Sequence, residues 1–157
     1  MAIAREISKS SKKLFAIVVL TGARTFFNDL NRALEYNGVA VEYDEIKLNS
    51  YSGTQSTGKV SIQMDVSKDI EGKNVFIIED IIDTGRTISF LKDYLLHEKK
   101  ASSVKICALF DKPSRREVKI KIDYAGFEVP NEFIVGFGMD YKGKYRELPF
   151  VGVLRER

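Results

Sequence analysis

The stretch VFIIEDIIDTGRT, residues 75–87, determines how we expect the rest of the chain to be arranged. It begins with a short apolar run, which is typical of a strand buried on both faces of a sheet. Two carboxylates, Glu79 and Asp80, stand at the carboxyl end of this run, and a third, Asp83, follows in a turn. Apolar residues then recur at helical spacing over residues 87–96. The pattern predicts a strand, a polar turn and a helix.

A turn of this kind suits a ligand that carries a phosphate and a sugar. In open α/β sheets, ligands bind beyond the carboxyl ends of the strands, and the start of a helix offers unpaired N–H groups to an anion. Residues 84–87 add hydroxyls, a glycine and the cation Arg86. Buried carboxylates destabilise a fold unless a cation, a sugar or a base uses them. The chain contains neither a Walker loop nor a G-x-G-x-x-G fingerprint.

Two other apolar runs repeat this pattern. Residues 14–20 predict a buried strand, which is followed by a turn at Thr21 and Gly22 and by a helix that ends near residue 37. Residues 103–110 predict a further buried strand, which ends at Lys112. This alternation predicts an α/β fold with a mostly parallel twisted sheet flanked by helices. We expect the three strand ends to converge on one edge of that sheet.

The remaining segments are less regular. Residues 2–13 predict the end of a helix and a polar turn, and residues 114–123 predict a basic exposed segment. The small and polar residues 49–58 predict an exposed mobile loop, which includes Ser50 and Tyr51. Further strands are expected at residues 39–48, 59–66, 125–128 and 132–139. We see no repeat and no linker, so one domain over residues 1–157 is expected.

Composition narrows the classes of protein. Of 157 residues, 44% are hydrophobic and 30% are charged, which is typical of a globular domain. The net charge of +3 is spread along the chain and does not indicate nucleic-acid binding. One cysteine, Cys107, excludes an internal disulfide and fits a reducing compartment. No apolar run approaches the ~20 residues that span a bilayer, and we find no signal peptide, so a cytoplasmic protein with no membrane partner is expected.

Each candidate residue also has an ordinary structural explanation. Glu79 and Asp80 could be a solvated strand end, and Asp83 could cap a helix. Lys112 could be a surface lysine. For the remaining candidates, the ordinary explanations are a core position for Phe133, solvated charges for Asp140 and Arg146, and a helix-end role for His97.

The quoted stretch resembles the ribose-phosphate motif of the type I phosphoribosyltransferases, and the form of residues 81–85 resembles the hypoxanthine-guanine branch. Four further stretches resemble parts of that branch in the same order. Residues 20–23 resemble its pyrophosphate loop, and residues 50–58 resemble its mobile catalytic loop. Residues 111–116 and 126–141 resemble its purine-binding end.

The resemblance implies a type I phosphoribosyltransferase fold with a small hood formed mainly by the C-terminal part. It implies transfer of ribose 5-phosphate from phosphoribosyl pyrophosphate to N9 of a 6-oxopurine, with release of pyrophosphate. Mg²⁺ would be the cofactor, and a homodimer or homotetramer would be the expected assembly. The products would be IMP or GMP, made from hypoxanthine or guanine.

Residue roles follow from the same resemblance. Asp83 would exchange a proton with purine N7, and the residues from Asp83 to Thr87 would bind the 5′-phosphate. Glu79 and Asp80 would face the ribose hydroxyls with one Mg²⁺ nearby, and Asp140 would help to hold a second. The remaining roles concern the base and pyrophosphate. Lys112 would bind the purine 6-oxo group, Phe133 would stack on the base, and Ile134 would read its edge through the backbone. Thr21, Gly22 and Arg146 would contact pyrophosphate.

Two departures from the family pattern stand out. The family's pyrophosphate loop often carries a lysine where this chain has Thr21, so Arg24 or Arg146 would have to replace that cation. The segment before the first strand is also short, which leaves the hood to residues after Ser114. Two further hypotheses therefore stay open: a nucleotide-sensing regulator of the same fold, which does no chemistry, and a transferase that prefers xanthine or a pyrimidine.

Overall fold

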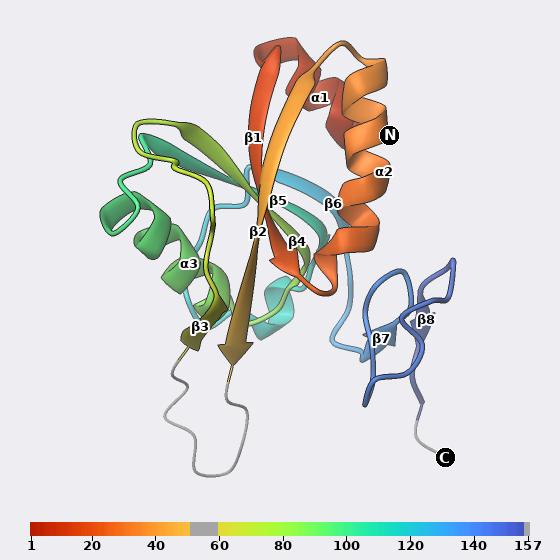
Figure 1. Ribbon diagram of the computed structural model, residues 1–157. Helices are drawn as coiled ribbons and strands as arrows, with labels where there is room; N and C mark the ends of the chain where they lie inside the picture. Colours follow the sequence, from red (N-terminus) through yellow and green to blue (C-terminus); the bar gives the residue numbers. More distant parts are fainter. Residues whose placement is uncertain (51–59, 156–157) are drawn as a thin grey trace.

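The central element is a six-stranded sheet with the order β3–β2–β1–β4–β5–β6 (Figure 1). The structure is a computed structural model that describes residues 1–50 and 60–155. The strands are β1 Lys13–Leu20, β2 Ala40–Ser50, β3 Val60–Met64, β4 Asn74–Ile82, β5 Ser103–Asp111 and β6 Tyr124–Glu128. Among the described strands of this sheet, only β2 and β3 pair antiparallel. The mostly parallel sheet predicted from the sequence is confirmed.

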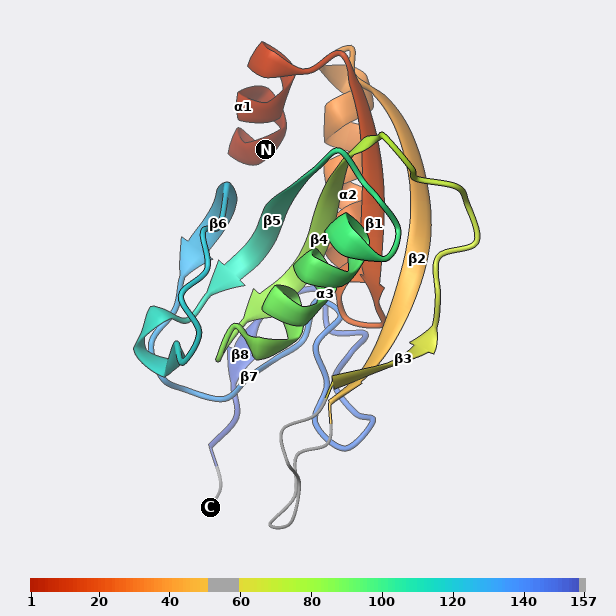
Figure 2. The same ribbon diagram turned by 90° about the vertical axis from the view of Figure 1, so that its left-hand side faces the viewer.

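Helices cover both faces of the sheet (Figure 2). They are α1 Ala2–Ser10, α2 Ala23–Tyr36 and α3 Arg86–His97, with a short 3₁₀ helix at Pro113–Arg115. The first two lie on one face and α3 lies on the other. Because successive residues of a strand point to opposite faces, β1 contributes to two separate cores. Ala16 and Val18 pack with α1 and α2, whereas Ile17 and Val19 pack with α3.

A second, small sheet lies beyond the carboxyl ends of β1 and β4 (Figure 1, blue). It consists of β7 Ile134–Val135 and β8 Gly152–Val153, which pair antiparallel. We call residues 129–155 the hood, as expected from the resemblance. The predicted strand over residues 132–139 is wrong in extent, because Gly136 and Gly138 have φ values of +95° and +100° and turn the chain after two strand residues.

Other details differ from the expectation as well. The helix of the quoted stretch begins at Arg86 instead of Thr87, and β2 continues to Ser50, two residues into the predicted loop. The rest of that predicted loop, including Tyr51, lies outside the described residues. The basic segment after β5 is not wholly exposed, since Ile120 and Ile122 pack against the core beneath α3. No helix within residues 1–50 and 60–155 has the length and apolar character needed to cross a membrane.

The position of Cys107 gives a test of this fold. Its side chain is fully buried in β5, and burial raises the pKa of the thiol to about 12. Since the thiolate is the reactive form, native protein should not react with DTNB at pH 8 on a time scale of minutes. In denaturant the same protein should release one equivalent, because the chain has one cysteine. Full labelling without denaturant would contradict the placement of β5 as a buried interior strand of the sheet.

Candidate active site

Three strand ends meet at one edge of the sheet, as the sequence predicts. The turn after β1, the connection between β4 and α3, and the residue after β5 line one cavity together with the hood. Its volume is about 320 Å³. The lining residues are Thr21, Gly22, Asp80, Ile81, Asp83, Lys112, Phe133, Ile134, Met139, Asp140 and Arg146. Site residues that the sequence predicts in four separate segments are therefore brought to one place.

The turn after β1 is packed tightly between β4 and the hood. A Cβ atom on Gly22 would collide with the carboxylate of Asp80, and one on Gly138 would collide with the backbone oxygen of Gly22. Any larger side chain at either position would have to displace its neighbour. The peptide bond between Leu20 and Thr21 is cis. The glycine contacts fix the distance between the turn, the acidic strand end and the hood.

The two acidic residues at the end of β4 have different environments. Glu79 is buried, with 7% of its surface exposed, whereas Asp80 is half-buried and lines the cavity. Desolvation by burial, followed by the negative charge of Asp80, raises the pKa of Glu79 well above its usual value. The backbone N–H of Asp80 donates to Glu79 Oε1 at 3.1 Å. A solvated strand end is therefore the wrong explanation for Glu79.

Beside this cavity lies a second one of about 210 Å³, which we call the phosphate cradle. It is lined by Glu79, Asp80, Ile81, Ile82, Asp83, Thr84, Gly85, Thr87 and Ile88. Gly85, with a φ of +84°, is the N-cap of α3. The first N–H groups of a helix have no helical partners and suit an anion. A cavity therefore lies at the turn where the sequence predicts a phosphate, and phosphate binding there stays a prediction.

The cation predicted in this cradle points elsewhere. Arg86 does not line the cavity, although Gly85 and Thr87 on either side of it do. Its Nη2 atom lies 2.6 Å from Oε2 of Glu117, in the segment after β5. Sequence reasoning could not find this pair, since the partner is distant along the chain and belongs to an irregular segment. The backbone N–H of Arg86 donates to Oγ1 of Thr84 at 3.4 Å, so this group is also engaged within the turn.

Asp83 lines both cavities, and 43% of its side chain is exposed. Its Oδ1 atom is covered and has no hydrogen-bond partner in the described part of the chain. The Nε atom of Arg115 lies 3.3 Å from this oxygen, without hydrogen-bond geometry. The exposed remainder of the carboxylate is what a ligand in either cavity can contact. A simple capping role for Asp83 is not seen, because α3 has no side-chain cap.

Lys112 and Phe133 form the opposite wall of the cavity. Lys112 is 7% exposed and its Nζ atom donates to the backbone oxygen of Glu132 at 2.8 Å, so it is not a surface lysine. Phe133 is 52% exposed, which excludes a core position, and its ring packs edge-on against Tyr141 with centroids 5.4 Å apart. A buried ammonium beside an exposed aromatic ring suits a flat ligand with an acceptor at its edge.

Asp140 and Arg146 are held together in the hood. Arg146 donates through Nη2 to Asp140 Oδ1 and through Nη1 to the backbone oxygen of Gly138, each at 2.6 Å. Both side chains line the cavity, so they are not freely solvated. Arg24, the other candidate for the missing cation, pairs with Glu45 at 2.8 Å and does not line the cavity. Of these two arginines, Arg146 is the one that faces the site.

Comparison with known proteins identifies the family. Residues 1–142 match the family of the phosphoribosyl transferase domain. The chain belongs to the phosphoribosyltransferase family. It is 50% identical over 148 residues to the hypoxanthine-guanine phosphoribosyltransferase of Streptococcus thermophilus, and the match covers 94% of this chain and 80% of the relative.

Solved structures of phosphoribosyltransferases share the fold. A hypoxanthine-guanine phosphoribosyltransferase from Bacillus anthracis, with a HEPES molecule in its active site, superposes with a TM-score of 0.89 at 41% identity, covering 98% of this chain and 90% of that one. A hypoxanthine phosphoribosyl transferase from Trypanosoma cruzi superposes with a TM-score of 0.89 at 35% identity, covering 98% and 84%. That structure concerns the role of its C-terminal region in oligomeric state and enzymatic activity.

The oxygen ligands of this phosphoribosyltransferase suit the magnesium that the resemblance implies. The described residues contain no group of three or more histidine, cysteine, aspartate or glutamate side chains that could hold a metal ion by themselves. Magnesium does not require such a group, since it keeps several waters and binds through one or two carboxylates and substrate phosphates. Asp80 and Asp140 line the same cavity, and Glu79 lines the adjoining cradle. These carboxylates suit Mg²⁺ ions whose remaining oxygen ligands would come from the substrate and from water.

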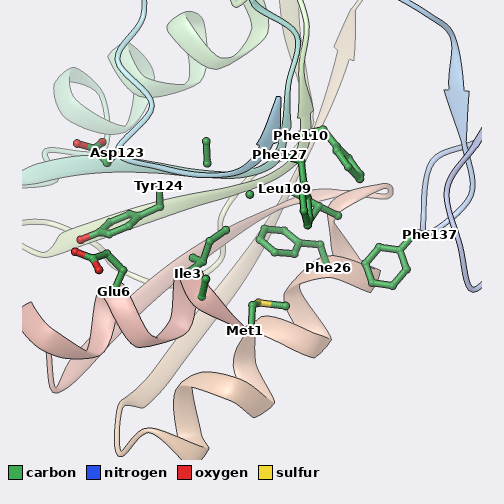
Figure 3. A pocket seen from close by; sticks show the side chains of 13 residues that line it. Met1, Ile3, Glu6, Phe26, Leu109, Phe110, Asp123, Tyr124, Phe127 and Phe137 are labelled. Atoms are coloured by element: carbon green, nitrogen blue, oxygen red, sulfur yellow. The ribbon is translucent and has the colours of Figure 1, made fainter. Parts of the chain in front are cut away.

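A larger cavity of this phosphoribosyltransferase lies elsewhere, and no motif in the sequence indicates it. It measures about 770 Å³ and lies between α1, α2, β5 and β6 (Figure 3). Its walls are mainly apolar and aromatic, and its charged side chains are the acidic Glu6 and Asp123. The smaller cavity is lined by the cations Lys112 and Arg146, which suit an anionic substrate better. We therefore take the smaller cavity as the candidate active site.

The contact between Gly22 and Asp80 gives a test of the site geometry. Gly22→Ala should lower the free energy of unfolding in urea by about 1–3 kcal/mol, because the new methyl group must displace the carboxylate. In an Asp80→Ala background the same change should cost less, since the colliding atoms are gone.

Gly152→Ala serves as the matched control. An added Cβ at Gly152 meets no atom within 4 Å, so its effect should stay within about 0.5 kcal/mol. Equal costs of Gly22→Ala in the two backgrounds would show that the side chain of Asp80 does not lie against the turn.

Proposed function

We propose that this chain is a purine-salvage phosphoribosyltransferase that uses hypoxanthine or guanine. It transfers the ribose 5-phosphate of phosphoribosyl pyrophosphate to N9 of the base and releases pyrophosphate. The observation that carries this proposal is one cavity in which a buried ammonium, an exposed aromatic ring and the Asp83 carboxylate adjoin a phosphate cradle. The names of the relatives support the same reaction.

Base selection depends on Lys112. One of its three N–H groups is used by the backbone oxygen of Glu132, which leaves donors for the 6-oxo group of the purine. Adenine offers an amino group at that position, so the remaining N–H groups of the buried ammonium would have no acceptor on the base. Phe133 stacks on the base, and the backbone of Ile134 reads its edge. Both residues line the cavity.

Asp83 is the proposed catalytic residue. Its carboxylate, which lines the cavity, accepts the proton of purine N7 while N9 attacks the ribose carbon, or returns a proton to N7 in the reverse direction. The reacting ribose carbon gains positive character as pyrophosphate leaves, and the nearby carboxylate of Asp80 stabilises that charge. Glu79 and Asp80 face the ribose hydroxyls.

The phosphate cradle binds the 5′-phosphate through Asp83, Thr84, Gly85, Arg86 and Thr87. The donors are the N–H groups at the start of α3 and the two threonine hydroxyls. The N–H of Arg86 would exchange its 3.4 Å hydrogen bond to Thr84 Oγ1 for one to the phosphate. Pyrophosphate lies on the other side, against Thr21, Gly22 and Arg146. Arg146 takes the place of the lysine that the family often carries in the turn, because its guanidinium has further N–H groups after binding Asp140 and Gly138.

Magnesium is the proposed cofactor. Asp80, Glu79 and Asp140 are the residues that would hold it, together with substrate oxygens and water. When bound, it would neutralise the charge of the departing pyrophosphate. The oligomeric state is proposed to be a homodimer or homotetramer, in line with the link between the C-terminal region and oligomeric state in the Trypanosoma cruzi relative.

The nucleotide-sensing hypothesis is not favoured by the basic segment on which it depended. Arg115 lies next to Asp83, Arg116 pairs with Asp111 and Lys121 pairs with Asp123. These cations are neutralised within the chain and do not form a free patch for nucleic acid. The xanthine-preferring hypothesis finds no support in the names of the relatives.

The first functional prediction concerns the reaction. With phosphoribosyl pyrophosphate and Mg²⁺, the enzyme should release pyrophosphate in the presence of hypoxanthine or guanine, and EDTA should abolish the release. Asp83→Asn should lower kcat about 10²–10⁴-fold, because the amide cannot accept the N7 proton. A spectrophotometric assay against a panel of purines measures this. The proposal is wrong if hypoxanthine, guanine and xanthine all fail.

The second functional prediction concerns selection of the base. Lys112→Met keeps the aliphatic stem and removes the donor, so kcat/KM for hypoxanthine should fall at least about tenfold. The preference for hypoxanthine over adenine should shrink by a similar factor. Lys119→Met is the control, since Lys119 is exposed and does not line the cavity, and it should leave both values unchanged. An unchanged preference for hypoxanthine over adenine in Lys112→Met would show that Lys112 does not recognise the base.

A further inference from the structure

The phosphate cradle is held from outside by the segment that follows β5. The backbone N–H groups of Glu117 and Val118 both donate to the backbone oxygen of Thr84, at 2.9 and 3.1 Å. The Nη2 atom of Arg116 reaches the backbone oxygen of Ile82 at 3.4 Å. The wall of the cradle is therefore a contact between two segments, with the proposed ligand-binding backbone on one side and residues 116–118 on the other.

Gly85 shows how close this contact is. A Cβ atom there would lie 3.0 Å from the backbone oxygen of Val118 and 3.0 Å from Cδ of Arg116. Its φ of +84° also disfavours any other residue. The turn that presents N–H groups to a phosphate thus has no space behind it, and its shape depends on where residues 116–118 lie.

One ion pair joins the two sides beyond these backbone contacts. Arg86 Nη2 and Glu117 Oε2 are 2.6 Å apart, with about half of each side chain exposed. The guanidinium is directed at Glu117, away from the cradle whose lining includes both neighbours of Arg86. A cation next to a phosphate site would ordinarily be taken for a phosphate ligand. Here it is already engaged by a carboxylate.

We infer that Arg86 is a positioning residue, which holds the cradle in its phosphate-binding shape through Glu117 and is not a side-chain ligand of the phosphate. The inference rests on the proposed function, because it assumes that the cradle binds the 5′-phosphate of phosphoribosyl pyrophosphate. The pair fixes Thr84 and Gly85 before the substrate binds, so less conformational entropy is lost on binding. Glu117, which does not line the cradle, thereby contributes to substrate affinity.

The two possible roles of Arg86 predict opposite effects of removing Glu117. If Arg86 positions the cradle, Glu117→Gln should raise KM for phosphoribosyl pyrophosphate about two- to fivefold, the size expected from a half-exposed ion pair, with kcat unchanged. If Arg86 is a phosphate ligand, Glu117 competes for it, and Glu117→Gln should lower KM. A lower KM would overturn the inference.

The control for charge alone is Glu98→Gln. Glu98 is exposed at the end of α3, the helix that begins at the cradle, and does not line the cradle. Removing its charge should leave KM unchanged or slightly lower it, because an anionic substrate is then repelled less. A rise in KM that is specific to Glu117→Gln therefore reports the lost pair. An equal rise in both variants would overturn the inference.

A charge swap completes the test. Arg86→Glu should raise KM at least about tenfold, since two carboxylates would then face each other beside the cradle. Arg86→Glu with Glu117→Arg restores the pair in the opposite sense, and KM should return to within about twofold of wild type. If KM in the swap stays as high as in Arg86→Glu, Arg86 contacts the phosphate directly. Urea unfolding of each variant at the assay temperature separates effects on KM from loss of folded protein.

Failure of the proposed function is distinguishable from failure of this inference. If wild-type enzyme turns over none of the purines, the proposed function is wrong, and the same variants are compared by calorimetric binding of ribose 5-phosphate. There the affinity should fall in Glu117→Gln and recover in the swap. Tighter binding by Glu117→Gln would overturn the positioning role whatever the reaction of the enzyme is.

Discussion

Parallel pairing of β1, β4 and β5 is the constraint on which the rest of the molecule depends. Ile17 pairs with Ile77, which pairs with Ile106, so the three strands run in register and end at the same edge. Each strand is buried on both faces, and polar residues can follow it only where the sheet stops. The turn after β1, the acidic end of β4 and Lys112 are neighbours for that reason. The hood and the segment after β5 then close around a site that the sheet has already assembled.

The buried polar groups follow from this geometry. Glu79 and Lys112 are the two charged residues buried in the described part of the chain, and both stand at the carboxyl edge of the sheet. Burying such groups is unfavourable, and each has one partner within the chain: the backbone N–H of Asp80 for Glu79 and the backbone oxygen of Glu132 for Lys112. The remaining hydrogen-bonding capacity of both side chains is what a sugar, a metal ion or a purine can use.

The sequence predicts the sheet well, because strands such as β4 and β5 are continuous apolar runs that end in turn residues. It also predicts which residues line the cavity, since those residues follow strand ends or lie in motifs of known order. It fails in the hood, where two glycines with positive φ end a strand that Ile134 and Val135 begin. It fails for Arg86 too, since Glu117 approaches only through the irregular path of the chain after β5. Such partners depend on tertiary packing and leave no local pattern.

The contacts of Gly22 restrict which substitutions this sequence can accept. Positions 22, 80 and 138 are far apart along the chain, yet a side chain at position 22 or 138 would need space that atoms of Asp80 or Gly22 occupy. A side chain at position 138 would collide with backbone, whereas one at position 22 would require the carboxylate of Asp80 to move or to be replaced. Substitutions at the three positions should therefore depend on one another. Neutral substitutions should be more frequent at the surrounding positions than at these three.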